Sequence, residues 1–124
     1  MQVDADNPTP IFQQIVSGIA AAVAAGVYRP GELVPSVRQQ AVAIRVNPNT
    51  VQRAYEQLER HGLLRPRRGS GMEVADGAAD IAAQLVADAV RDTFGRGIGA
   101  GRAARLSRTA IDGIYRKAWN GDPT

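Results

Sequence analysis

The chain has 124 residues, contains no cysteine and carries a formal net charge of +3. This length fits one domain, or one small domain with an appendage, and the lack of cysteine excludes disulfides and thiolate metal sites. Hydrophobic residues make up 44% of the sequence and aromatic residues only 5%, so we expect a core of aliphatic side chains and alanine. The chain has no run of about 18 apolar residues, and residues 1–10 are polar and acidic. We therefore expect a cytoplasmic protein without a membrane span or a signal peptide.

The first predicted helix opens at Thr9-Pro10, with Thr9 as its cap and Pro10 in its first turn, after a flexible lead over residues 1–9, and ends at Gly26. Its apolar residues recur at helical spacing and form one broad stripe, which indicates packing against other elements. The stripe consists of Ile11, Phe12, Ile15, Val16, Ile19, Ala22 and Val23.

A turn over residues 28–31 and a short extended piece, Leu33-Val34, lead to a second predicted helix. Ser36 and Gln39 have the spacing of a capping box, in which each side chain satisfies a backbone amide of the other residue. The spacing predicts a helix from Ser36 to about residue 44, with Arg38 on its polar side.

The third predicted helix carries the pattern that points most directly to function. Asn47 suits the N-cap, and Pro48 suits the first helical position, which needs no amide donor. Gly62 predicts the helix end. The apolar face is predicted to consist of Val51, Ala54, Tyr55 and Leu58, and the polar face of Asn49, Gln52, Arg53 and Glu56. Arginine and amide side chains near a helix start suit base edges and phosphates in a DNA major groove, although an ordinary solvated surface helix has the same periodicity.

Two short apolar stretches after Gly62 predict a β-hairpin, with strands over residues 63–67 and 72–74 and a glycine-rich tip between them. Pro66 restricts the first strand to a sheet edge. A hairpin directly after such a helix predicts a winged helix-turn-helix. The cations between Glu59 and Glu73, which can approach phosphates, are Arg60, Arg65, Arg67 and Arg68.

The remaining chain predicts a helical pair. We expect a domain boundary after Ala75, a linker over residues 76–79, one helix over residues 80–94 and another over residues 103–119. The glycine-rich stretch 95–101 is interpreted as the corner between them. The fold class is therefore mainly α with a small β-hairpin: a winged helix-turn-helix DNA-binding domain over residues 1–75 and a short helical dimerisation domain over residues 76–124.

Enzymatic alternatives are weaker. The stretch 95–101 lacks the Gly-Lys-Ser/Thr ending of a phosphate loop and does not follow a predicted strand. His61 is the only histidine and has no nucleophile or carboxylate at triad or metal spacing. We therefore expect no catalytic residue, no metal site and no cofactor.

An ordered set of motifs resembles the GntR family of bacterial transcription regulators over residues 10–75. The matching stretches are Pro10–Ile15, Gly26, Pro30–Arg38, Val46–Tyr55, Leu58, Gly62-Leu63 and Gly69–Gly71. The helical tail of about fifty residues is similar to that of the YtrA subfamily, whose members pair through two C-terminal helices. Larger GntR members bind an effector in a bigger C-terminal domain; this tail is too short for that pocket, so effector control is left open.

The resemblance implies that Ser36 and Arg38 contact phosphate or base, that the start of the third helix enters the major groove, and that the wing tip touches DNA. Family members often carry arginine where this chain has Pro48 and Gln52, and Arg45 or Arg53 are expected to supply the charge instead. The predicted DNA-binding residues are Ser36, Arg38, Arg45, Asn47, Asn49, Thr50, Gln52, Arg53, Arg67, Arg68, Gly69 and Ser70.

The sequence thus predicts a sequence-specific DNA-binding regulator, acting as a repressor on an inverted-repeat operator. The expected partners are double-stranded DNA and a second copy of the chain, joined through the C-terminal helices and optionally the first helix. Two-fold symmetry would place two half-sites about one helical turn apart. The alternative is a winged-helix module that binds protein rather than DNA.

Overall fold

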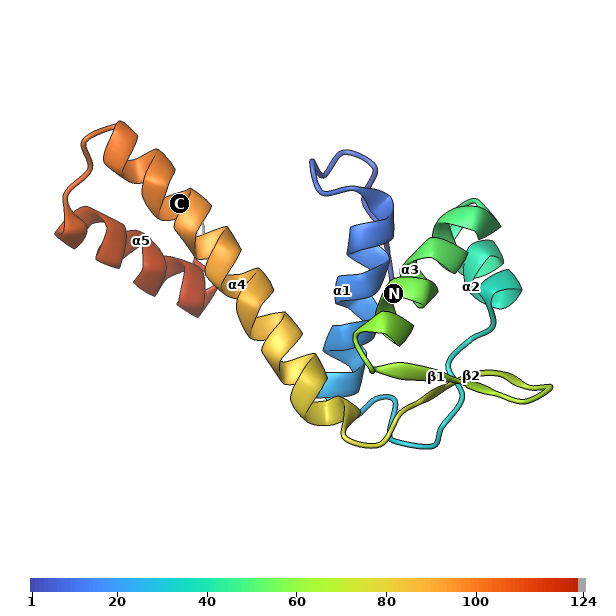
Figure 1. Cartoon of the computed structure of the whole chain (residues 1–124). Helices are drawn as coiled ribbons and strands as arrows, with labels where there is room; N and C mark the ends of the chain where they lie inside the picture. The colour runs from blue at the N-terminus through green and yellow to red at the C-terminus, as the bar shows by residue number, and fades with distance from the viewer. Residues whose placement is uncertain (123–124) are drawn as a thin grey trace. The chain divides into compact units, whose positions relative to one another are not determined.

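The computed structural model describes residues 1–122, which form five helices and one two-stranded sheet (Figure 1). The chain divides into two compact units, Met1–Ala87 and Asp88–Thr124. The elements in chain order are α1 (Ile11–Ala24), α2 (Val37–Ile44), α3 (Pro48–Arg60), β1 (Leu64–Arg67), β2 (Gly71–Val74), α4 (Ala78–Ala103) and α5 (Arg108–Asn120).

The residues before α1, which the sequence predicts to be a flexible lead, are folded back against that helix in the structure. The Gln14 side chain bonds the backbone of Asp4 in both directions, at 2.8 Å each, and also donates to the Thr9 carbonyl at 2.9 Å. Met1 Sδ accepts from Gln40 Nε2 at 3.3 Å. The predicted Thr9 cap was wrong, because Pro10 occupies the N-cap position and offers no side-chain acceptor.

The local signals that delimit α2 and α3 are confirmed. Ser36 Oγ accepts from the Gln39 amide at 3.0 Å, and Gln39 Oε1 accepts from the Ser36 amide at 2.9 Å. Asn47 Oδ1 accepts from the Asn49 amide at 2.8 Å. Gly62 ends this region with a φ of +80°, a left-handed conformation that glycine adopts without steric cost.

The first unit has one hydrophobic core, in which α3 packs against α1, α2 and β1. Tyr55 is the largest fully buried side chain, and its hydroxyl donates to the Pro35 carbonyl at 2.6 Å, tying α3 to the segment before α2. Burial, and secondarily the charge of Tyr28, raises the pKa of Tyr55 above its usual 10.0. The core residues contributed by the helices α1 and α3 are Ile15, Val16, Ile19, Ala20, Val23, Val51, Ala54, Tyr55 and Leu58.

The predicted hairpin is confirmed, with β1 antiparallel to β2 and Pro66 opposite Met72. The segment before α2 lies along the other edge of β2. Backbone hydrogen bonds run from Gly31 to Val74, from Val74 to Glu32, and from Val34 to Met72, at 2.8 to 3.0 Å. β1 is therefore an edge strand, as the proline requires, and the hairpin is fixed to the rest of the first unit.

The compact first unit extends beyond the boundary expected after Ala75. Ala78 and Ala82 are fully buried, and Ile81, Leu85 and Val86 pack against the same core. The start of α4, through Ala87, therefore belongs to the winged-helix unit, because its small and apolar side chains complete the core of that unit.

The glycine-rich stretch is helical, so its interpretation as a corner was wrong. Helix α4 continues through Ala103, and the glycines at 95, 97, 99 and 101 all have negative φ. The chain turns instead at residues 104–107, where Arg105 has a φ of +62° and Ser107 Oγ caps α5 by accepting from Ala110 at 3.1 Å. Gly101 has a packing role there: a β-carbon on it would lie 3.1 Å from Ile111 Cδ1.

The second unit has little core of its own. No residue of α5 is buried. Phe94 meets Tyr115 edge-on with ring centroids 6.1 Å apart, and Tyr115 stacks on Trp119 at 6.3 Å. Trp119 is nevertheless 79% exposed. The other exposed large apolar side chains of the second unit are Val90, Phe94, Ile98, Leu106, Ile114 and Tyr115.

Candidate nucleic-acid interface

The polar face of α3 is open to solvent, because the opposite face is buried in the core. Asn49, Gln52 and Arg53 are all exposed. Gln52 Nε2 donates to Glu56 Oε1 at 3.2 Å. The Arg53 guanidinium lies 3.8 Å from the centroid of the Phe12 ring, a cation–π contact that links α3 to α1. The face thus presents amide groups in solvent and one arginine held at its edge.

The turn between α2 and α3 brings two further predicted residues together. Arg45 caps α2 in the left-handed conformation, with φ 56° and ψ 51°, and is exposed. Arg45 and Thr50 line one hollow of about 400 Å³ together with Ile11 and Ile44 of the neighbouring helices. Asn47 is exposed, but its side chain is engaged in capping α3.

The start of α2 adds a cation and a hydroxyl. Arg38 is exposed and forms no ion pair within residues 1–122. Ser36 is half-buried, and its hydroxyl is engaged by the Gln39 amide. The capping bond uses a lone pair of the Ser36 oxygen, so the hydroxyl can still donate to an anion, and Arg38 is also available to one.

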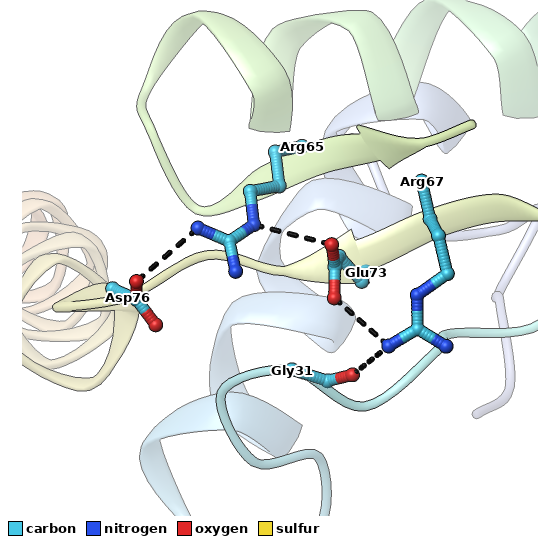
Figure 2. A network of polar contacts seen from close by, with 5 residues as sticks. All are labelled: Gly31, Arg65, Arg67, Glu73 and Asp76. Atoms are coloured by element: carbon cyan, nitrogen blue, oxygen red, sulfur yellow. Dashed lines mark hydrogen bonds and ion pairs between the residues drawn. The ribbon is translucent and has the colours of Figure 1, made fainter.

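The wing has fewer arginines free of carboxylate partners than the sequence predicts. Figure 2 shows Arg65 and Arg67 of β1 joined to carboxylates rather than pointing freely into solvent. Glu73 Oε1 lies 3.3 Å from Arg65 Nε, and Glu73 Oε2 lies 3.0 Å from Arg67 Nη2. Arg65 Nη1 also lies 3.3 Å from Asp76 Oδ2. The hydrogen bond to Asp76, and then the contact with Glu73, raises the pKa of Arg65. Arg67 donates in addition to the Gly31 carbonyl.

The tip of the wing remains available. Arg68, Gly69 and Ser70 are exposed, and the Ser70 amide closes the tip by donating to the Arg67 carbonyl at 2.9 Å. In Figure 1 this tip and α2 lie on the same side of α1. The first unit therefore offers a cation at the wing tip, cations around α2 and the amide face of α3.

Sequence reasoning missed Glu73 and Asp76, which flank the arginine-rich stretch rather than interrupt it. The strand register places Glu73 directly opposite Arg65. Pairing the residues on the two sides of the hairpin tip would therefore have predicted this contact from the sequence.

Within residues 1–122 no group of three or more histidine, cysteine or acidic side chains is placed to hold a metal ion. No helix in that range combines the length and apolar character of a membrane span.

Comparison with known proteins decides the family. Residues 11–74, which hold α1 to β2, match the bacterial regulatory proteins of the gntR family. The chain belongs to the GntR family. The match includes the capping box of α2, the whole of α3 and the hairpin.

A relative with a known regulatory role supports the assignment within GntR. The chain is 40% identical over 78 residues to the HTH-type transcriptional repressor YtrA of Bacillus subtilis. That match covers 63% of this chain but only 60% of YtrA.

Solved GntR structures extend the likeness to nearly the whole chain. A GntR family transcriptional regulator from Listeria monocytogenes has a TM-score of 0.76 and 29% identity, covering 90% of this chain and 97% of its own. YtrA from Sulfolobus acidocaldarius, a GntR-family transcription factor, has a TM-score of 0.59 and 25% identity, covering 98% of this chain and 97% of its own. The winged-helix fold with a helical C-terminal appendage is thus that of YtrA-like GntR regulators.

Proposed function

We propose that this protein is a sequence-specific DNA-binding transcriptional regulator that represses from an inverted-repeat operator in the cytoplasm. The observation that carries the proposal is the exposed polar face of α3, held by a capped helix start and a buried opposite face, in a chain of the GntR family. A rigid helix with amide side chains in solvent is the form in which major-groove base edges are read. Repression is inferred from the likeness to YtrA.

The contacts divide by chemistry. Asn49, Thr50 and Gln52 at the start of α3 read base edges, while Arg38 and Arg45 hold phosphates and fix the register. At the wing, Arg68 with the backbone of Gly69 and Ser70 contacts the neighbouring phosphates. Arg53 stays at the margin because of its contact with Phe12. Arg67, Ser36 and Asn47 act mainly by holding the wing and the helix starts in place.

The second unit forms a homodimer with another copy of the chain. A helical pair whose second helix buries no residue cannot enclose a stable core, and its exposed apolar side chains, including Trp119, require a partner. The apolar stripe of α1 is already buried in the first unit, so we confine the dimer surface to the C-terminal helices. Two copies would present two α3 helices to two half-sites about one helical turn apart.

A binding experiment separates this function from a winged helix that binds protein. Fragments of the source genome are selected on the purified protein, and the enriched duplex is titrated in an electrophoretic shift assay over a salt series. Arg38→Ala should weaken binding to all duplexes and flatten the plot of log affinity against log salt by about 0.9, the value for one neutralised phosphate. A protein that shifts no duplex at low salt would support the protein-binding alternative.

A further inference from the structure

The arginines of the wing are electrically balanced by carboxylates. Arg65 and Arg67 are 45% and 42% exposed, whereas the Glu73 side chain between them is only 13% exposed. Each Glu73 oxygen meets a different guanidinium, and Asp76 meets Arg65 (Figure 2). Two cations face two anions, so the net charge of this group is zero. Positive charge at the wing is therefore left to Arg68.

Glu73 also fixes where the two guanidiniums lie. A guanidinium has five donors in a rigid fork, and Arg67 directs one nitrogen to both Glu73 and the Gly31 carbonyl. Gly31 belongs to the segment hydrogen-bonded to β2, so Arg67 is tied to the body of the first unit. A phosphate that drew Arg67 away from this position would break both bonds of Nη2 and leave Glu73 Oε2 without its ion pair, at a cost in free energy because the Glu73 side chain is largely buried.

We propose that Glu73 sets DNA specificity by restraining Arg65 and Arg67 from phosphates, which keeps sequence-independent affinity low. This inference rests on the proposed function. Phosphate contacts supply essentially all of non-specific binding, whereas specificity is the difference between two affinities. A wing with two free arginines would bind every duplex more tightly and narrow that difference. Asp76 has a smaller part, because it is largely exposed and meets Arg65 alone.

The first test compares wild-type protein with Glu73→Gln on a selected duplex and on a scrambled duplex of equal length. The neutral amide keeps the size of the side chain while removing the ion pairs of Glu73 with the two arginines. We expect tighter binding to the scrambled duplex, a salt slope steeper by about 0.9 for each additional phosphate that the protein neutralises, and a lower ratio of specific to non-specific affinity. Asp92→Asn, an equal charge change on an exposed residue of the second unit, should leave the slope unchanged.

A second comparison assigns the change in slope to a particular side chain. Arg67→Gln should alter the slope little in the wild-type background and should reverse part of the steepening in the Glu73→Gln background, a coupling that a double-mutant cycle measures. If Glu73→Gln fails to fold by circular dichroism, the triple variant Arg65→Gln, Arg67→Gln, Glu73→Gln, which leaves neither Glu73 nor the two arginines as an unpaired charge, replaces it and should keep the wild-type slope.

Three results would refute the proposal that Glu73 restrains the two arginines. These are an unchanged slope in folded Glu73→Gln, an equal effect of Arg67→Gln in both backgrounds, or a flattened slope in the triple variant. A wild-type protein that binds neither duplex would overturn the proposed function as well, whereas wild-type binding with any of the three results would overturn the role of Glu73 alone.

Discussion

The Tyr55 hydroxyl is a buried polar group whose hydrogen bond contributes to folding stability. Tyr55→Phe removes the 2.6 Å bond to the Pro35 carbonyl and should lower the free energy of unfolding by about 0.5–1.5 kcal/mol. Urea denaturation at neutral pH, followed by circular dichroism, measures this. A variant as stable as the wild type would show that solvent replaces the bond without cost.

The same residue predicts a loss of stability in alkali. Burial raises the pKa of Tyr55 in the folded protein above the 10.0 of an exposed tyrosine, so the folded state holds the proton more tightly than the unfolded state. Its contribution is fully present below about pH 10 and is lost as the pH rises above that value. Denaturation of the wild type over this range should show a steeper decline than Tyr55→Phe, and parallel declines would refute the assignment.

Two amide side chains carry the proposed base reading. Asn49→Ala and Gln52→Ala should each change the preferred bases at one position, with a loss of about 1–3 kcal/mol of discrimination for a bidentate contact. Selection from randomised duplexes measures the preference. Glu59→Ala, an exposed change in the last turn of α3, is the control. A binding motif that is identical for all four proteins would exclude Asn49 and Gln52 as readers.

At the scale of elements, α4 offers a matched pair of glycines. Gly99 has open space around its α-carbon, while a β-carbon on Gly101 would lie 3.1 Å from Ile111 Cδ1. Alanine is favoured over glycine inside a helix by about 1 kcal/mol. Gly99→Ala should therefore raise the melting temperature, and Gly101→Ala should raise it less or lower it, because Ile111 must move. Equal increases would mean that the Ile111 side chain yields freely.

The elements that sequence predicted well are those set by residues within four positions of each other. The capping box of Ser36 and the Asn47-Pro48 start of α3 are local chemistry, and the structure reproduces both. The position of the lead against α1 depends instead on Gln14 reaching back to Asp4, and the wing ion pairs depend on strand register. The glycine-rich composition of residues 95–101 predicted the turn after α4 too early in the chain, since glycine permits both a turn and a helix. The DNA-contacting role of each site residue stays a prediction.

At the scale of the whole molecule, dimerisation should depend on the aromatic side chains of the second unit. Trp119 is 79% exposed and stacks on Tyr115, which suits an interface anchor. Trp119→Ala should weaken the dimer by about 2 kcal/mol or more, roughly thirtyfold in Kd. Sedimentation equilibrium measures the change, and binding to a two-half-site duplex should weaken with it.

Val27→Ala is the control for that experiment, because Val27 is 66% exposed but belongs to the first unit. It should leave the association unchanged. A wild-type protein that sediments as a monomer at micromolar concentration would refute the dimer, and equal weakening by the two variants would refute its assignment to the C-terminal helices.

The left-handed backbone of Arg45 has a consequence for how this domain tolerates mutation. A non-glycine residue in that conformation costs roughly 1–2 kcal/mol, and Arg45 adopts it at the cap of α2, just before α3. Glycine would relieve the strain and would also delete a guanidinium from the surface proposed to face DNA. Arg45→Gly is therefore expected to raise thermal stability and to lower the proposed affinity for DNA. Selection for heat resistance alone would favour a protein that binds DNA less tightly.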